Sequence, residues 1–479
     1  MTERFYELHL IHSNDLHSHL DRMSRISGHI QRFRNNFGID HVIALDMGDH
    51  LDRMDPVTEG TQGRVNVAVL NQTGYDAIAF GNNEGLTFEA HVLQALYDHQ
   101  ARMPMLAANL YDLNGQRPSW VEPYTIIQKG PIKVGIIGVT IDFNTFYELL
   151  GWHIREPLAE VADQVRVLRD QVDLLCVASH VGISADRKMA ATIDGIDAIF
   201  GAHTHHRLDP PEQVGNTWLF AAGKFGQVLG HAQFVWDTHE KKLAHIGGRL
   251  IDLGDENAPI DETIDHTIAM YRQESDLVMS GVAMELSVPL HHDASNESLL
   301  ANVMATQLRR GTEAEIGLVN SGVFLHGFPF GRITKGDLLS ACPSPINPCI
   351  MLLNGSHILQ ALELSLDETH IQKSLMGYGF RGKVIGTLAV DGLLIQADRN
   401  QPVGKRIVSV EVNGELLNLE RKYRVGTIDL FTFHVAYPSI GLGTTIEYVL
   451  PDFIRDWLAS ACQSEELIEQ ASNQKWKFI

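Results

Sequence analysis

The chain has 479 residues, a length that predicts two to four domains at about 150 residues each. Lysine and arginine number 38 and aspartate and glutamate 59, so the net charge of −21 argues against binding to nucleic acid or an anionic membrane, both of which need a positive field. The hydrophobic fraction of 44% indicates a folded globular protein, and no apolar run approaches the ~18 residues of a membrane-spanning helix.

The N-terminal sequence MTERFYELHLIHSND contains no apolar segment followed by a small-residue cleavage site, so it predicts no secretory signal. The four cysteines form no CxxC pair. Such sparse cysteine is typical of a reducing compartment, and we expect a cytoplasmic protein. We also expect Cys342 and Cys349, which flank a proline-rich stretch, to be free thiols beside a rigid turn.

Short apolar runs alternate with amphipathic segments through the first 250 or so residues. The predicted strands are residues 6–11, 42–47, 77–80, 133–139, 172–178 and 198–202. The predicted helices between them include residues 64–72, 88–99 and 158–170. This alternation predicts an α/β layered fold for residues 1–254.

Residues 255–280 begin with the acidic, proline-containing sequence DENAPIDETI, and we expect a loop followed by a helix that links two domains. Residues 281–479 mix predicted strands (GLVN, IMLL and IVSVEV) with predicted helices at 298–309 and 356–366. This region predicts a second, smaller α+β domain.

Polar clusters follow five of the apolar runs in the first region. They are Asn14–His19, Gly48–His50, Gly81–Glu84, His180 and His203–His206. In α/β sheets, ligands bind outside the carboxyl ends of the strands, so these clusters are expected to converge on one edge.

The residue types in these clusters indicate metal chemistry. Aspartate, histidine and asparagine without cysteine suit divalent ions such as Mn, Zn, Fe or Co. Asp15 and His17, like His203 and His205, are two residues apart and point to one side of an extended chain. Asp49 can bridge two ions with its two oxygens, and two ions about 3.5–4 Å apart activate water for phosphoryl transfer.

The ordered set NDLHSH, GDH, GNNE, SHVG and GAHTHH resembles the signature of the metallophosphoesterases, and its spacing resembles the 5′-nucleotidase family. The resemblance covers nearly the whole chain. It implies a four-layer α/β/β/α domain with a dinuclear metal site, followed by an α+β nucleotidase-like domain that binds the substrate. By motif position, one metal would be held by Asp15, His17, Asp49 and His205, and the other by Asp49, Asn82, His180 and His203.

The third motif departs from the family pattern Gly-Asn-His-Glu, whose histidine assists the transition state and is oriented by an aspartate three residues on. Asn83 replaces this histidine and Leu86 replaces the aspartate. An amide carries no proton that titrates near neutral pH, and general acid catalysis contributes about 10²–10⁴-fold. We therefore expect a slower enzyme or another catalytic group, with His50 and Arg53 as candidates. The alternative interpretation of these two residues is an exposed loop.

The second region departs as well. The substrate-binding arginine that the family carries after its Asn-Ser/Gly-Gly motif is absent, although Asn320 is present. The family also clamps the base between two aromatic rings. The candidate substrate-binding residues are Asn320, Tyr378, Phe380, Arg381, Phe431 and Phe433. Core packing is the alternative for the aromatic residues, and residues 331–337 (GRITKGD) are expected to support the fold.

The resemblance predicts a metal-dependent hydrolase that attacks a small phosphate ester with a metal-bridging hydroxide. A nucleotide is the expected substrate, in a reaction of the 5′-nucleotidase or 2′,3′-cyclic phosphodiesterase type. The alternative is a protein that binds metal and nucleotide with little turnover, because the motif histidine is Asn83. Metal-dependent amide hydrolysis fits the same ligand types but fits the Gly-Asn and Gly-Asp pairs less well. The sequence does not predict the oligomeric state.

Overall fold

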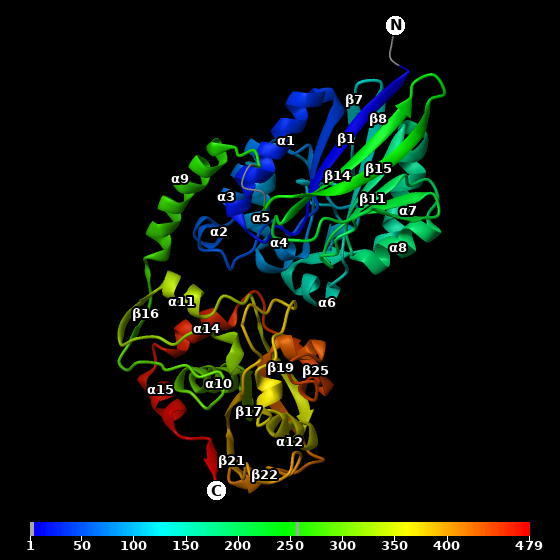
Figure 1. The fold of residues 1–479 in the computed structure, drawn as a ribbon. Helices are drawn as coiled ribbons and strands as arrows, with labels where there is room; N and C mark the ends of the chain where they lie inside the picture. Colours follow the sequence, from blue (N-terminus) through cyan, green and yellow to red (C-terminus); the bar gives the residue numbers. More distant parts are fainter. Residues whose placement is uncertain (1–3, 255–257) are drawn as a thin grey trace. The chain divides into compact units, whose positions relative to one another are not determined.

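The computed structural model describes residues 4–254 and 258–479 (Figure 1). The chain divides into two compact units, Met1–Asp276 and Leu277–Ile479. The predicted linking segment, 255–280, begins with residues 255–257, which lie outside the described residues. Most of the remainder forms α9 (Glu262–Met279), and its buried Ile264 and Ile268 pack into a hydrophobic cluster of the first unit. The N-terminal part of this helix is therefore a component of the first unit's core.

Two β-sheets form the centre of the first unit. The first sheet contains, in order, β15 (Lys242–Asp252), β14 (Val228–Asp237), β1 (Phe5–Ser13), β2 (Val42–Asp46), β3 (Ala77–Ala79), β4 (Met105–Leu106) and β6 (Val121–Glu122). The second sheet contains β12 (Glu212–Val214), β13 (Thr217–Phe220), β11 (Ala198–Gly201), β10 (Leu174–His180), β8 (Ile132–Thr140) and β7 (Tyr124–Lys129). The central pairs β1–β2, β2–β3, β8–β10 and β10–β11 are all parallel.

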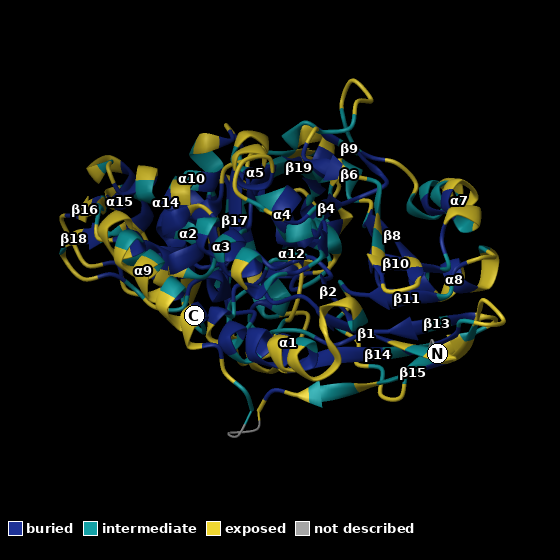
Figure 2. Ribbon diagram, turned by 90° about the horizontal axis from the view of Figure 1, so that it is seen from above, coloured by how far each residue is buried: buried dark blue, intermediate teal, exposed yellow. Residues whose placement is uncertain are grey.

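The two sheets are packed face to face between layers of helices. Alternate apolar residues of both sheets, such as Leu10 and Leu45 from the first and Ile136 and Phe200 from the second, form one buried cluster. The outer face of the first sheet is covered by α1 (Met23–Phe37), α3 (Arg64–Thr73) and α5 (Ala90–Tyr97), and that of the second by α7 (Pro157–Leu168) and α8 (Ile183–Thr192). Figure 2 shows exposed residues on the outer sides of α7 and α8 and largely buried strands. The predicted α/β/β/α order of layers is confirmed.

The six predicted strands of this unit lie in β1, β2, β3, β8, β10 and β11. The predicted helix over 88–99 is shorter than expected. Phe88 has an extended backbone (φ −111°, ψ 140°) and separates α4 (Asn82–Thr87) from α5. Because α4 begins at Asn82, with Gly81 as its N-cap, the third polar cluster occupies the first turn of α4.

The second unit is α+β, as predicted, and has one continuous hydrophobic core. Its larger sheet has the order β20 (Leu388–Asp391), β17 (Ile316–Asn320), β24 (Lys422–Ile428), β19 (Pro348–Asn354) and β25 (Thr444–Tyr448). A four-stranded sheet has the order β23 (Glu415–Leu416), β22 (Ile407–Val412), β21 (Leu393–Ala397) and β26 (Trp476–Phe478), and β16 (Val282–Leu286) pairs with β18 (Gly331–Thr334). The helices are α10 (Leu299–Gly311), α11 (Lys335–Ala341), α12 (Gly355–Leu364), α13 (Glu368–Ile371), α14 (Ile454–Ala461) and α15 (Glu465–Ser472).

Two sequence motifs of this unit have structural roles. The Thr334 side chain accepts a hydrogen bond from the backbone N–H of Asp337, whose carboxylate accepts one from Thr334 N, so the GRITKGD segment caps α11. Cys342 and Cys349 are both free and buried, and burial raises the pKa of the Cys342 thiol to about 12. Within the described part of the chain, no helix is both long and apolar enough to cross a bilayer.

Candidate metal centre

The loops after β1 and β2 hold each other in a tight, left-handed conformation. Asp15, His17 and Asp49 have φ values of 44°, 47° and 51°, a region that non-glycine residues occupy only when their surroundings enforce it. The backbone N–H of Asp15 donates to Gly48 O (3.2 Å), and that of His17 donates to Asp49 O (2.8 Å). These bonds turn the three side chains toward the same side of the sheet edge.

The other polar side chains come from three further strand ends. His180 is the last residue of β10, Asn82 opens α4 after β3, and His203 and His205 follow β11 with φ values of 69° and 56°. The backbone N–H of His203 donates to Asp15 Oδ1 at 3.1 Å, which links the second sheet to the first across the edge. The expected convergence of strand ends is therefore present in the structure.

Two groups of potential ligand atoms result. Asp15, His17 and His205 form one group and Asp49, His180 and His203 the other, and within each group one atom per residue lies within 4.8 Å of the others. Asn82 adjoins the second group, because its Oδ1 lies 2.8 Å from His203 Nδ1. The groups adjoin each other through Asp49, whose Oδ2 lies 3.8 Å from His17 Nε2 and whose Oδ1 lies 3.3 Å from His180 Nε2.

This donor set fits divalent cations. The Asp15 and Asp49 carboxylates are buried beside imidazole nitrogens, and a buried cluster of oxygen and nitrogen donors is costly unless a charge compensates it. His180 Nε2 is buried and forms no hydrogen bond, although Asp49 Oδ1 is near. Its Nδ1 is paired with Met47 O at 2.7 Å, which leaves Nε2 available as a ligand.

The charges of the site are strongly coupled. Burial acts to raise the pKa of Asp49, but the neighbouring His180 and His17 rings and the Asn83 backbone N–H together hold it well below its usual range. Burial acts to lower the pKa of His180, but Asp49 outweighs it and raises the value to about 10. Burial and the nearby Asp49 charge raise the pKa of Glu84 to about 8. In the absence of bound cations, the site therefore favours an ion pair between Asp49 and His180.

The structure places the predicted catalytic residues in different surroundings. Asn83 lies at the donor groups, because its backbone N–H donates to Asp49 Oδ1 (2.7 Å) and its Nδ2 lies 2.8 Å from His17 Nδ1. His50 is 2% exposed, and burial lowers its pKa to about 3, so its ring is neutral at neutral pH. Arg53 donates through Nε and Nη2 to Glu59 (2.6 and 2.8 Å). The alternative that His50 belongs to an exposed loop is wrong.

Two residues of this centre were not among the predicted site residues. Glu84 accepts hydrogen bonds from the backbone N–H groups of Asp49, His50 and Leu51 at 3.1, 2.8 and 3.1 Å. Asp52 Oδ2 lies 3.2 Å from His17 Nδ1. Glu84 belongs to the GNNE motif, and Asp52 follows Asp49 by three residues. Both could have been predicted from the sequence as carboxylates within or near a motif.

The predicted substrate residues of the second unit separate into buried and exposed groups. Phe380 and Phe431 belong to the hydrophobic core, and Asn320 is buried with its Nδ2 donating to Ile385 O (2.6 Å). Tyr378 is 51% exposed, and its ring centroid lies 5.3 Å from that of the partly buried Phe433. Arg381 adjoins this segment, where its backbone N–H donates to Ser344 Oγ (2.9 Å).

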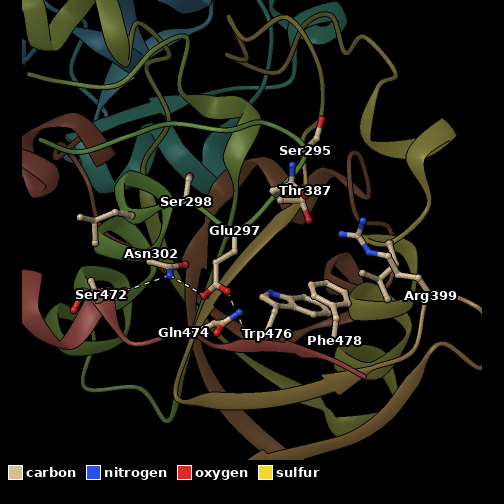
Figure 3. A pocket seen from close by; sticks show the side chains of 14 residues that line it. Ser295, Glu297, Ser298, Asn302, Thr387, Arg399, Ser472, Gln474, Trp476 and Phe478 are labelled. Carbon is tan, nitrogen blue, oxygen red and sulfur yellow. Dashed lines mark hydrogen bonds between the residues drawn. The ribbon is translucent and has the colours of Figure 1, made fainter.

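A separate pocket of about 470 Å³ opens elsewhere in the second unit (Figure 3). Its lining includes Glu297, Asn302 and Trp476 but none of the predicted substrate residues. The Glu297 carboxylate accepts hydrogen bonds from Asn302 Nδ2 (2.9 Å) and the Trp476 backbone N–H (3.3 Å). These bonds tie α10 to the C-terminal strand, so the acidic group of this pocket has a structural role.

Comparisons with known proteins agree with this architecture. Residues 279–434 match the sequence profile of the 5′-nucleotidase, C-terminal domain. The uncharacterized metallophosphoesterase YunD of Bacillus subtilis is 33% identical over 456 residues, which cover 95% of this chain and 98% of YunD. The trifunctional nucleotide phosphoesterase protein YfkN of the same organism is 25% identical over 88% of this chain and 31% of its own length. The crystal structure of a 5′-nucleotidase precursor from Thermus thermophilus superposes with a TM-score of 0.61 at 22% identity, covering 99% of both chains.

Proposed function

Because this chain belongs to the metallophosphoesterase superfamily, in its 5′-nucleotidase family, we propose that it hydrolyses a phosphate ester of a nucleotide with two divalent cations. The observation that carries the proposal is the meeting of two donor groups, Asp15–His17–His205 and Asp49–His180–His203, at one edge of the layered sheets. Four separate strand ends supply these groups and a fifth, that of β3, supplies the adjoining Asn82. A purely structural role would not require so many buried or partly buried ligand-type side chains at one point.

We assign the ligands according to these groups. One cation would be held by Asp15, His17, His205 and Asp49, and the other by Asp49, Asn82, His180 and His203. Such cations, when bound, acidify a water molecule and offset the negative charge of the phosphoryl group. Mn, Zn, Fe and Co all suit this set of ligands.

Asn83 is the side chain that we assign to the phosphoryl oxygens. Its backbone N–H donates to Asp49 Oδ1 (2.7 Å) and its side-chain Nδ2 lies 2.8 Å from His17 Nδ1, so the residue contacts a member of each donor group. The amide N–H can donate a hydrogen bond to the phosphoryl group, but it has no proton to give to the leaving group. The buried, neutral His50 is a poor proton donor at neutral pH, and Arg53 is engaged by Glu59. We therefore propose that solvent protonates the leaving group.

A nucleotide is the proposed substrate class because YfkN is a nucleotide phosphoesterase and the second unit matches a 5′-nucleotidase domain. Tyr378 and Phe433 are the aromatic residues available for the base. Their centroid distance of 5.3 Å is shorter than the roughly 7 Å needed to insert a base between two rings at normal contact distances. We propose that the base stacks on the exposed face of Tyr378, with Arg381 nearby for the polar part of the nucleotide.

The test is metal analysis and a substrate panel on one preparation. The protein is stripped with a chelator, reloaded with Mn, Zn, Fe(II) or Co, and assayed with 5′-nucleotides, 2′,3′-cyclic nucleotides and p-nitrophenyl phosphate. We expect two metal equivalents and a higher kcat/KM for one nucleotide class than for p-nitrophenyl phosphate. Two bound equivalents without turnover of any ester would favour the binding-protein alternative, which membership of a hydrolase family does not favour. Equal rates with all esters would reject the nucleotide.

A further inference from the structure

Asp52 has a buried carboxylate whose two oxygens have different surroundings. The residue lies in the loop after β2, three residues beyond Asp49, and is 1% exposed. Its Oδ1 accepts a hydrogen bond from the Met54 backbone N–H (3.0 Å), and its own backbone N–H donates to Ser18 Oγ (2.7 Å). These bonds set the plane of the carboxylate and direct Oδ2 toward the donor groups.

Two side-chain nitrogen atoms lie close to this Oδ2. It lies 3.2 Å from His17 Nδ1 and 3.5 Å from Asn83 Nδ2, and the two nitrogens are 2.8 Å apart. Both nitrogens can carry hydrogen, but only the carboxylate oxygen is always an acceptor. The arrangement therefore joins one proposed metal ligand and the proposed phosphoryl contact through a single carboxylate.

The chemistry of a histidine ligand decides how the protons are arranged. A ring that binds a cation through Nε2 carries its proton on Nδ1, and that N–H needs an acceptor. The Asn83 amide nitrogen cannot accept it, so Asp52 Oδ2 is the acceptor. Asn83 Nδ2 can then donate one hydrogen to Asp52 and keep the other for the substrate.

The two histidines of the second group do not depend on Asp52. His180 Nδ1 is paired with the backbone oxygen of Met47, and His203 Nδ1 with Asn82 Oδ1. His17 thus differs from them in having a carboxylate beside its second ring nitrogen, which makes it a more basic ligand and fixes its orientation.

We propose that Asp52 is a positioning residue that orients both His17 and Asn83, an inference that rests on the proposed function. The position three residues after Asn83, where the family pattern has an aspartate, is occupied by Leu86, which packs against the hydrophobic core. Asp52 supplies a carboxylate to the same side chain from the neighbouring loop. In the family pattern, the histidine and its orienting aspartate both belong to the third motif. In this chain, the corresponding pair is Asn83 of the third motif and Asp52 of the loop after β2.

The experiment compares Asp52→Asn with Asp55→Asn, a matched control in the same loop. The Asp55 carboxylate accepts from the Thr58 backbone N–H and caps α2 (Pro56–Thr61), and it belongs to neither donor group. Mn²⁺ affinity is measured by calorimetric titration, ligand geometry by the visible spectrum of the Co²⁺-loaded protein, and folding by the thermal midpoint of the stripped protein. Asp52→Asn is expected to weaken one of the two Mn²⁺ sites about 10–100-fold and to change the Co²⁺ spectrum. Asp55→Asn should leave both unchanged.

Two further measurements test the role of Asp52 without relying on the single variant Asp52→Asn. Asp52→Glu keeps a carboxylate and is expected to bind Mn²⁺ more tightly than Asp52→Asn. In a double-mutant cycle, the kcat losses of Asp52→Asn and Asn83→Ala should be less than additive, because both remove the same contact. Wild-type affinity, spectrum and kcat in Asp52→Asn would overturn this inference while the wild-type protein still hydrolyses nucleotides. A wild-type chain that binds no divalent cation would overturn the proposed function as well.

Discussion

The Glu84 carboxylate accepts a hydrogen bond from the backbone N–H of Asp49, with 3.1 Å between Oε2 and N. The same carboxylate also binds the backbone N–H groups of His50 and Leu51, so it caps the whole turn after β2. This turn carries Asp49 in its left-handed conformation. Glu84 of the third polar cluster therefore holds the backbone of the second cluster in place, although 35 residues separate Asp49 from Glu84.

The variant Glu84→Gln tests how much these hydrogen bonds to the turn after β2 stabilise the protein. The amide offers one acceptor oxygen and turns an N–H₂ group toward backbone donors, so a buried donor is left unpaired. Because burial raises the pKa of Glu84 to about 8, the unfolding free energy of the metal-free protein should fall by about 1–3 kcal/mol in urea titrations at about pH 9, where the carboxylate is ionised. Glu89→Gln is the control, because the exposed Glu89 carboxylate forms no capping hydrogen bond although the residue is the N-cap of α5. Equal losses in the two variants would show that the cap contributes nothing.

Asp49→Asn should disrupt both proposed metal sites, because its two oxygens face different donor groups. We expect fewer than two metal equivalents and a loss in kcat of more than about 100-fold, the upper range for losing an outer-shell partner of a metal. The metal content is measured by mass spectrometry on dialysed protein. Asp142→Asn, at an exposed loop carboxylate, should retain wild-type values. Full activity with normal metal content in Asp49→Asn would reject the bridging role.

Substitutions of Asn83 separate hydrogen bonding from proton transfer. Asn83→Ala removes the amide N–H and should lower kcat about 10–100-fold with little change in KM, which steady-state assays with one nucleotide can measure. Asn83→His restores a titratable ring, but Asp52 Oδ2, 3.2 Å from His17 Nδ1, would have to orient both rings, so the gain should stay below about tenfold. A larger gain would show that the amide limits the rate.

Substitutions of the four aromatic candidates should have different effects according to burial: exposed rings should affect nucleotide binding, and buried rings should affect stability. Tyr378→Ala is expected to raise KM for nucleotides and to leave the KM for p-nitrophenyl phosphate unchanged, because the latter has no base. Phe431→Ala, in the core, should instead lower the unfolding free energy by about 3–5 kcal/mol. Kinetic assays and urea unfolding on both variants distinguish the two effects. A nucleotide KM unaltered by Tyr378→Ala would eliminate the stacking proposal.

Asp429 predicts a pH dependence of stability in the second unit. Burial raises the pKa of its carboxyl to about 7, and its Oδ1 forms no hydrogen bond. Between the unfolded pKa of about 4 and this value, the folded state binds the proton more tightly, so stability falls as pH rises. Asp429→Asn removes this group. Its unfolding free energy relative to wild type should rise from pH 5 to pH 7 by about 1–3 kcal/mol. Parallel curves for the two proteins in urea titrations would contradict the assignment.

The convergence of the proposed ligands was predictable from the sequence because each of them is next to a strand end. Parallel strands of a layered sheet end at a common edge, so the polar clusters after them could be brought together from the sequence. The extended backbone expected for the Asp15–His17 and His203–His205 pairs is wrong, because all four residues have positive φ values. The alternation of apolar runs and amphipathic segments likewise predicted an α/β layered fold, whereas the order of the layers was implied by the family resemblance. These are properties of local pattern and of sheet geometry.

Other relationships depend on conformations that no local pattern encodes. Asp52 reaches His17 and Asn83, and Glu84 reaches the turn at Asp49, only because several non-glycine residues adopt positive φ values under the constraint of neighbouring loops. Tyr378 and Phe380 are two residues apart in the glycine-rich segment MGYGFRG, yet Tyr378 is exposed and Phe380 is part of the core. Composition and spacing determined which chemical groups are available. Tertiary packing decided which of these groups are in contact, because the conformation of each loop depends on its contacts with the rest of the fold.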